Sequence, residues 1–255
     1  VTTNVIDTLR IFEGYADLHM GPWEGNLSRD GQLVALNGQR GNEAVAFAYE
    51  LTSGTKHADL LLSGIELDWV SISASGRYIV VNGGFAENGD QTQVYDLDGH
   101  TVGELWHEYG RPSHYDLSLD TDSEDVAVGV SKSAPDDGRV IKRRLRDGNV
   151  TVLTDGGYAS HTSTRNVDRP GWAYVSFQHP GPTWPPYWNE VVAVSLAGGR
   201  VERIAHMHAL QTDYEAEAHA VPSPDGQRVL FASNWGESSG RPVAAYVATL
   251  PGSDR

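Results

Sequence analysis

Histidines and acidic residues recur just upstream of a repeated turn, and their types suit metal binding and proton transfer. Counting back four residues from the turn serine gives Glu24, Trp69, His114 and His219, and His161 lies at nearly the same place in the fourth repeat. A lone histidine in a strand is usually structural, but three at equivalent repeat positions favour a functional cluster. We therefore expect these side chains to converge on one site.

One of these histidines has neighbours typical of proton-transfer chemistry. His114 is flanked by Tyr115 and Asp116. It is a candidate general base with an orienting partner, because a neutral imidazole exchanges protons near physiological pH. We predict His114 as the base, with Tyr115 or Tyr158 as the proton donor.

A second group of residues has the spacing of metal ligands. Glu217 and His219 are two residues apart and so lie on one face of a strand, and His161 from the adjacent repeat is a third candidate. Nitrogen and oxygen ligands of this kind suit Mn, Zn or Ca, so we predict a divalent metal ion as cofactor. The same His-x-His spacing occurs in His206 and His208.

An arginine on the same predicted strand as His161 completes the catalytic candidates. Arg165 lies four residues after His161, on the same face of an extended strand. Its planar guanidinium suits a carboxylate. We therefore predict that Arg165 binds an acidic group of the substrate.

The elements that must position these residues form a repeat of about 45 residues, which is a typical length for a propeller blade. The turn motif occurs at positions 27–31, 72–76, 117–120, 167–171 and 223–226. A short apolar strand follows each turn, a third strand follows in most repeats, and Asp-Gly and Gly-Gly signals separate the strands. This pattern predicts an all-β fold, a β-propeller of four-stranded antiparallel blades.

The repeat also predicts the domain organisation. We expect one propeller domain over 1–255, with repeats at roughly 15–60, 61–106, 107–155, 156–206 and 207–255. Five inner hairpins are countable, so the chain is either a five-bladed propeller or part of a larger ring.

Composition limits the partners. The 255 residues carry a formal net charge of −15, which argues against a nucleic-acid partner, because binding phosphates needs clustered Lys and Arg. No run of roughly 18 apolar residues occurs, so we expect no membrane partner. There is no cysteine, which excludes disulfides and thiolate chemistry and fits a secreted, periplasmic or cytoplasmic location equally.

With these motifs the chain resembles the β-propeller polysaccharide lyases, especially the oligogalacturonate lyase family and more loosely the ulvan lyases. The resemblance rests on the Ser-Pro-Asp-Gly repeats, on His219 before the best of them, and on the histidines that open the two preceding blades. It implies a seven-bladed ring, a metal at the channel mouth held by histidines and a Gln, and a nearby His base and Arg. By this resemblance His161 and His219 match metal ligands and His114 matches the catalytic His, whereas Glu217 replaces a usual His and Tyr214 the usual Gln.

The residues and the resemblance together predict a lyase that cleaves uronic-acid-containing glycans by β-elimination. The C5 proton beside a uronate carboxylate becomes acidic once that carboxylate is neutralised, by the metal or by Arg165. His114 would take the proton, and Tyr115 or Tyr158 would protonate the leaving oxygen. The expected partner is an anionic oligo- or polysaccharide.

Aromatic residues are candidates for stacking on sugar faces, although aromatics at such positions also pack blades together. The predicted substrate-binding residues are Trp23, Trp69, Trp184 and Trp188.

Two other functions fit the same residues. One is a non-catalytic propeller that binds a protein or a glycan, with its histidines filling the channel. The other is a glycoside hydrolase, which needs two carboxylates. Glu24 with Glu217 or Asp116 would supply them.

Overall fold

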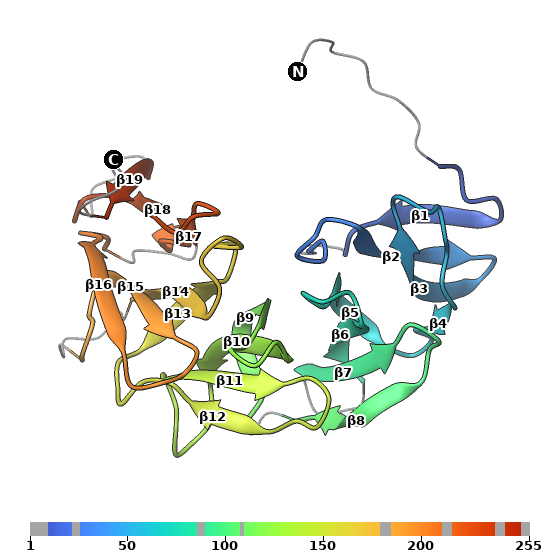
Figure 1. The fold of residues 1–255 in the computed structure, drawn as a ribbon, viewed down its shortest axis with the longest axis horizontal. Helices are drawn as coiled ribbons and strands as arrows, with labels where there is room; N and C mark the ends of the chain where they lie inside the picture. The colour runs from blue at the N-terminus through green and yellow to red at the C-terminus, as the bar shows by residue number, and fades with distance from the viewer. Residues whose placement is uncertain are drawn as a thin grey trace, which may run out of the picture. The chain divides into compact units, whose positions relative to one another are not determined.

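The computed structural model describes residues 10–21, 26–85, 90–107, 110–178, 185–210, 216–237 and 243–250. The chain divides into two compact units, Val1–Thr101 and Val102–Arg255. The described residues form nineteen strands in five sheets and no α-helix (Figure 1). A helical segment with the length and hydropathy of a transmembrane span is not found in these ranges.

The first unit contains one complete four-stranded sheet and most of a second. In the first sheet the order is β1 (Tyr15–His19), β2 (Leu33–Arg40), β3 (Glu43–Glu50) and β4 (Leu60–Leu61). In the second the order is β5 (Glu66–Ile72), β6 (Tyr78–Gly84), β7 (Asp90–Asp96) and β8 (Thr101–Trp106), and the division between the units falls at the start of β8.

The second unit contains three sheets. Their strands follow the chain order from first to last across each sheet. The first contains β9 (Pro112–Leu119), β10 (Asp125–Ser131), β11 (Val140–Arg144) and β12 (Val150–Val152). The second contains β13 (Ala159–Ser163), β14 (Trp172–Phe177), β15 (Glu190–Ser195) and β16 (Val201–His206). The third contains β17 (Val221–Pro222), β18 (Arg228–Ser233) and β19 (Ala244–Thr249).

The fold class predicted from the repeat is confirmed. All described strand pairings are antiparallel, and four of the five sheets have four strands, with three described in the last. Each sheet coincides with one sequence repeat. That the whole chain forms one propeller domain stays a prediction.

The middle strand β14 is apolar on both faces because sheets of the second unit pack against both of its sides. Every residue of β10 is buried, and in the second unit one core cluster includes Val128 of β10 and Val175 of β14. A second cluster includes Tyr174 of β14 and Val229 of β18. Fully burying a side chain such as Val stabilises the fold by about 1.5–3 kcal/mol.

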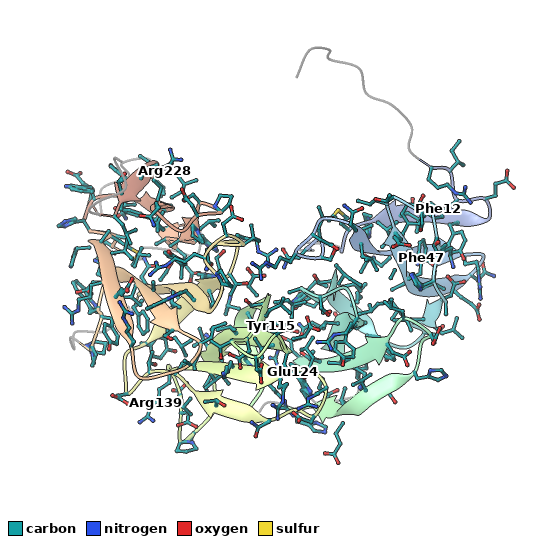
Figure 2. The ribbon with its side chains drawn as sticks, in the orientation of Figure 1. Phe12, Phe47, Tyr115, Glu124, Arg139 and Arg228 are labelled. Carbon is teal, nitrogen blue, oxygen red and sulfur yellow. The ribbon has the colours of Figure 1, made fainter. Side chains whose placement is uncertain are left out.

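The first unit has its own core. Aromatic rings gather on its first sheet, where the centroids of Phe12 and Phe47 are 5.3 Å apart (Figure 2). Such aromatic pairs contribute about 0.5–1.5 kcal/mol beyond the area they bury.

The serine and the aspartate of the repeated turn stabilise it by hydrogen bonds within the turn. In the last sheet the Ser223 hydroxyl donates to the Asp225 carboxylate and accepts from the Arg228 backbone N–H at 3.0 Å, while Asp225 accepts from the Gln227 N–H at 3.0 Å. Gly226 supplies the positive φ of 66° that closes the turn. This turn fixes where the first strand of the sheet ends, and therefore where the residues upstream of it lie.

Candidate active site

The three histidines predicted to converge lie together in the second unit. The ring centroids of His161 and His219 are 3.8 Å apart with the rings nearly parallel, and those of His114 and His161 are 4.6 Å apart and nearly perpendicular. His114 lies on β9, His161 on β13, and His219 in the segment before β17. Each is therefore near the start of the first strand of its sheet.

Glu217 joins these histidines and completes a group of three potential metal ligands. The ligand atoms of His161, Glu217 and His219 all lie within 4.8 Å of one another. Nε2 of His161 is hydrogen-bonded to Oε2 of Glu217, and Nε2 of His219 lies 3.8 Å from the same oxygen. The side chains of His161 and Glu217 are only 13% and 11% exposed. Two imidazoles and a carboxylate at this spacing fit a divalent ion such as Zn or Mn, with positions left for other ligands.

The protonation states of two histidines suit this chemistry. Burial lowers the pKa of His161 to about 4, although its hydrogen bond to Glu217 acts in the opposite direction. Desolvation by the walls of the site also lowers the pKa of His114, although its side chain is partly exposed, and the charge of Lys132 lowers it further. Both imidazoles are therefore neutral near pH 7, as a metal ligand and a general base must be.

A β-bulge sets the direction of His114. The register of β9 against β10 shifts between Val128 and Val130, and His114 has a positive φ of 45°. Gly129 stands opposite the bulge, where an added Cβ would lie 2.5 Å from the Ser113 carbonyl oxygen. Bulges redirect side chains at functional sites, and positive φ in a non-glycine residue stores strain. His219 shows the same conformation, with a φ of 41°.

The backbone on both sides of Glu217 is fixed by one buried amide. The Gln178 side chain accepts from the Ala218 N–H at 3.1 Å and donates to the Ala216 carbonyl at 3.4 Å. Ser176 extends the attachment, because its hydroxyl accepts from the Ala220 N–H at 3.0 Å. The end of β14 therefore holds the segment that carries Glu217 and His219.

Asp116 and Arg165 form an ion pair that stabilises the backbone around the site. Oδ2 of Asp116 accepts from the Arg165 Nε at 3.0 Å and from the Thr164 N–H at 2.8 Å, and its Oδ1 accepts from an Arg165 terminal nitrogen at 2.9 Å and from the Leu117 N–H at 2.8 Å. A carboxylate with this many donors is a fixed ion-pair partner. Asp116 thus ties β9 to the end of β13, and its predicted role in orienting His114 stays a prediction. The Arg165 guanidinium was predicted to bind a carboxylate of the substrate. In the structure it binds the carboxylate of Asp116.

The site opens into a cavity of 180 Å³. It is lined by His114, Lys132, Tyr158, Ala159, Ser160, His161, Gln178 and Glu217. Of the two predicted proton donors, Tyr158 lines the cavity with His114, whereas Tyr115 is buried and is not part of the lining.

Sequence reasoning missed Lys132 and Gln178. Lys132 is exposed and follows the last residue of β10, and Gln178 is buried and follows the last residue of β14. Asn234 follows β18 in the same way. In the three repeats of the second unit this position is polar, and the position, not a motif, was the signal that could have found them.

The predicted sugar-stacking residues lie in different places. Trp69 is buried in the first unit, which is the packing role that the sequence left open. Trp188 is half-buried, with its ring centroid 6.0 Å from that of His206. Trp23, Trp184, Glu24 and Tyr214 lie outside the described residues.

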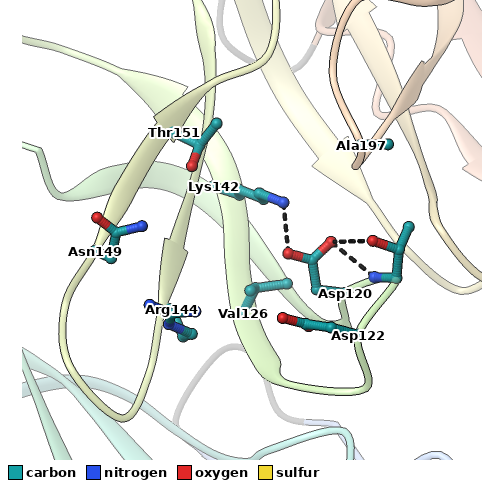
Figure 3. Close-up of a pocket in the computed structure, with 9 residues that line it drawn as sticks. Asp120, Asp122, Val126, Lys142, Arg144, Asn149, Thr151 and Ala197 are labelled. Carbon is teal, nitrogen blue, oxygen red and sulfur yellow. Dashed lines mark hydrogen bonds and ion pairs between the residues drawn. The ribbon is translucent and has the colours of Figure 1, made fainter.

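A second, larger cavity in the same unit is a structural junction. It has a volume of 360 Å³ and lies beside β11 (Figure 3). The Lys142 ammonium pairs with the Asp120 carboxylate and donates to the Leu196 carbonyl at 2.7 Å, and Asp120 also accepts from the Thr121 N–H at 2.7 Å. Its main cation and anion are therefore engaged with each other and with the backbone.

Comparison with known proteins identifies the fold and no more. No family model matches the chain, and no curated protein matches it. Among solved structures it is similar to TolB from Acinetobacter baumannii (TM-score 0.54, 13% identity, covering 91% of this chain and 54% of that one). It is also similar to the β-propeller domain of the Trilobed protease from Pyrococcus furiosus (TM-score 0.51, 13% identity, 91% and 69% coverage).

An oligogalacturonate lyase from Vibrio parahaemolyticus also matches, with a TM-score of 0.47, 14% identity, and coverage of 89% of this chain and 62% of that one. A likeness at this level does not set the lyase apart from the other propellers. The chain has the β-propeller fold and spans about half the length of the Acinetobacter TolB that it matches.

Proposed function

We propose that the protein is a polysaccharide lyase that cleaves uronic-acid-containing glycans by β-elimination. The observation that carries this proposal is a neutral imidazole, His114, whose ring centroid lies 4.6 Å from that of a potential metal ligand, His161. The same cavity presents a cation, Lys132, and a phenol, Tyr158. A base, a carboxylate-binding cation and an acid are the groups that β-elimination beside a carboxylate requires.

The cavity residues account for each proton and charge. Lys132 would bind the uronate carboxylate, a role that the sequence assigned to Arg165. His114 would take the C5 proton, the electron pair of that C–H bond would form the C4–C5 double bond, and the C4–O bond would break. Tyr158 would protonate the leaving oxygen. No water is consumed, and the two side chains would exchange protons with solvent to return to their starting forms.

His161, Glu217 and His219 would hold a divalent ion. When bound, such an ion supplies positive charge that lowers the energy of a neighbouring carboxylate as negative charge develops on it. Gln178 contributes by fixing the backbone of Glu217.

The hydrolase alternative needs two available carboxylates, and one of its candidates, Asp116, is already engaged in other hydrogen bonds. Asp116 is buried and accepts hydrogen bonds from Arg165, Thr164 and Leu117. It is therefore poorly placed to act as a glycosidase acid or nucleophile. Glu217 remains, and Glu24 lies outside the described residues.

The test is a spectrophotometric assay with polygalacturonate, ulvan and glucuronan fragments. We expect the ultraviolet band of an unsaturated uronate to appear with at least one of them. His114→Ala should remove the signal, and His100→Ala, a change at an exposed histidine of the first unit, should not. Reducing ends released without that band would favour a hydrolase, and binding without any cleavage would favour the non-catalytic propeller.

A further inference from the structure

A short segment after β16 displays two imidazoles on one side. Along residues 206–210, Met207 and Ala209 are buried, while His206 and His208 are exposed. This alternation is that of an extended strand, so both histidines point away from the core.

Two buried amides fix this segment. Asn189 donates to the Ala209 carbonyl at 2.8 Å and accepts from the Ala209 N–H at 3.0 Å. Asn234 donates to the Leu210 carbonyl at 2.7 Å and accepts from the Leu210 N–H at 2.8 Å. Each asparagine thus replaces a strand partner, and the two exposed imidazoles are held by a preorganised backbone.

The imidazoles belong to a continuous row of rings. Centroid separations along the row are 6.0 Å from Trp188 to His206, 4.5 Å from His206 to His208, 4.5 Å from His208 to Trp235, and 5.1 Å from Trp235 to Tyr246. Trp235 is 47% exposed and has a positive φ of 54°. Strained backbone conformations cluster at functional sites, so an exposed tryptophan held on such a backbone is a candidate ligand-binding ring.

The row lies on the same end of its sheet as the candidate active site. Across the fourth sheet, Ala159 pairs with Phe177, Phe177 with Glu190, and Glu190 with His206. His161 is two residues from Ala159. The cavity therefore lies at the first strand and His206 at the fourth strand, both at the same end of the sheet. Three strand spacings separate them, or about 14 Å.

The fifth sheet shows the same arrangement. Trp235 comes just after β18, and the segment with Glu217 and His219 comes just before β17. Because β17 and β18 are antiparallel, both lie at the same end of that sheet.

The hydrogen bonds of the row favour stacking over metal chelation. The His208 N–H donates to Nδ1 of His206 at 3.3 Å, so the neutral His206 carries its proton on Nε2. Neither ring nitrogen then offers a lone pair to a metal. The ring instead presents an N–H donor beside aromatic faces, which is suited to hydroxyl or carboxylate oxygens of a sugar.

We propose that this row of Trp188, His206, His208, Trp235 and Tyr246 is a remote glycan-binding platform. It would hold pyranose rings of the same chain whose cleaved bond lies in the cavity, at a distance of about three strand spacings. The platform rests on the proposed function for its substrate class, uronate-containing glycans. It predicts a preference for longer oligomers, because a short one fills the cavity and does not reach the platform.

The experiment measures binding of galacturonate dimer and hexamer by calorimetry, with glucuronan and ulvan fragments of the same lengths in parallel. All proteins carry His114→Ala to prevent turnover. Adding Trp235→Ala should weaken hexamer binding on the order of tenfold, equivalent to about 1.4 kcal/mol, and leave dimer binding unchanged. Trp172→Ala is the matched control, because Trp172 begins β14 at the opposite end of the sheet. Trp235→Phe should retain most of the affinity, and thermal unfolding checks that each variant is folded.

The outcomes separate this proposal from the lyase proposal. Equal loss of dimer and hexamer binding, unchanged hexamer binding, or no binding of any uronate oligomer would each overturn the platform. Hexamer binding that depends on Trp235, in a wild-type protein that forms no unsaturated product, would support the platform and contradict the lyase. Formation of the unsaturated product, together with hexamer binding that does not depend on Trp235, would support the lyase and contradict the platform.

Discussion

The second sheet of the first unit and the first sheet of the second unit use one backbone device for two purposes. In both, the first strand carries a bulge and the second strand carries a glycine opposite it, Gly83 in one and Gly129 in the other. An added Cβ at Gly83 would lie 2.4 Å from the Glu66 carbonyl oxygen, and at Gly129 it would lie 2.5 Å from that of Ser113.

The side chains at the two bulges differ. In the first unit, Asp68 accepts from the Asn82 amide at 2.6 Å, and Asn82 accepts from the Thr92 hydroxyl at 2.7 Å. These hydrogen bonds join three polar side chains of the sheet in one network. In the second unit the bulge exposes His114 to the cavity. The bulge therefore supplies a direction, and the residue placed on it decides whether the side chain joins a polar network or faces a cavity.

The largest contrast should come from truncating the side chain at each bulge. His114→Ala should lower turnover by about 10²–10⁴-fold, the usual contribution of a general base, with little change in melting temperature. Asp68→Ala should leave turnover unchanged but lower the unfolding free energy by about 1–3 kcal/mol, because it leaves the Asn82 amide without this acceptor. Initial rates and urea unfolding measure both. A large loss of stability in His114→Ala would show instead that this histidine is structural.

A smaller effect is expected from the amide that fixes Glu217. Gln178→Ala should weaken binding of Mn or Zn by about 10–100-fold, as for other groups that orient ligands. Gln178→Glu is the informative companion, because it still accepts from the Ala218 N–H but cannot donate to the Ala216 carbonyl. Calorimetric titration of each metal measures the change. Asn82→Ala, in the polar network of the first unit, should not alter metal affinity.

Alanine substitutions at Gly83 and Gly129 test whether both bulges need a glycine opposite them for the same steric reason. Gly129→Ala and Gly83→Ala should each cost about 1–3 kcal/mol of unfolding free energy, because the new methyl group meets backbone atoms that cannot move aside easily. Only Gly129→Ala should also reduce turnover beyond what its stability loss explains, since it shifts His114. Equal turnover in the two variants at a temperature where both are folded would contradict this link.

Much of this could be predicted from the sequence, for reasons that differ between residues. The Ser-x-Asp-Gly turns are local, so their spacing predicts the sheets and the positions just upstream of them, including His114, His161 and His219. Partner choice is not local. Asp116 is next but one to His114 in sequence, yet it accepts from Thr164 and Arg165, just after the first strand of the following sheet. Lys132 and Gln178 lie after second strands, where no chemical motif marks them.

The smallest predicted effect concerns His206, which belongs to the row of rings and to neither bulge. Although its side chain is exposed, partial desolvation lowers the pKa of His206, and the charge of His208 lowers it further. In His208→Gln, its titration midpoint, followed by NMR, should therefore rise part of the way toward the ordinary value of about 6.5. Trp172→Ala should leave it unchanged.

The sign of the accompanying stability change follows from the same shift. Between the ordinary pKa and the lower folded one, the unfolded chain binds more protons, so His206 contributes stability above about pH 6.5 that is lost as the pH falls toward its folded pKa. His208→Gln should make that loss smaller. A midpoint that falls in this variant would mean that the His208 side chain stabilises protonated His206 by accepting from it, and does not repel its charge.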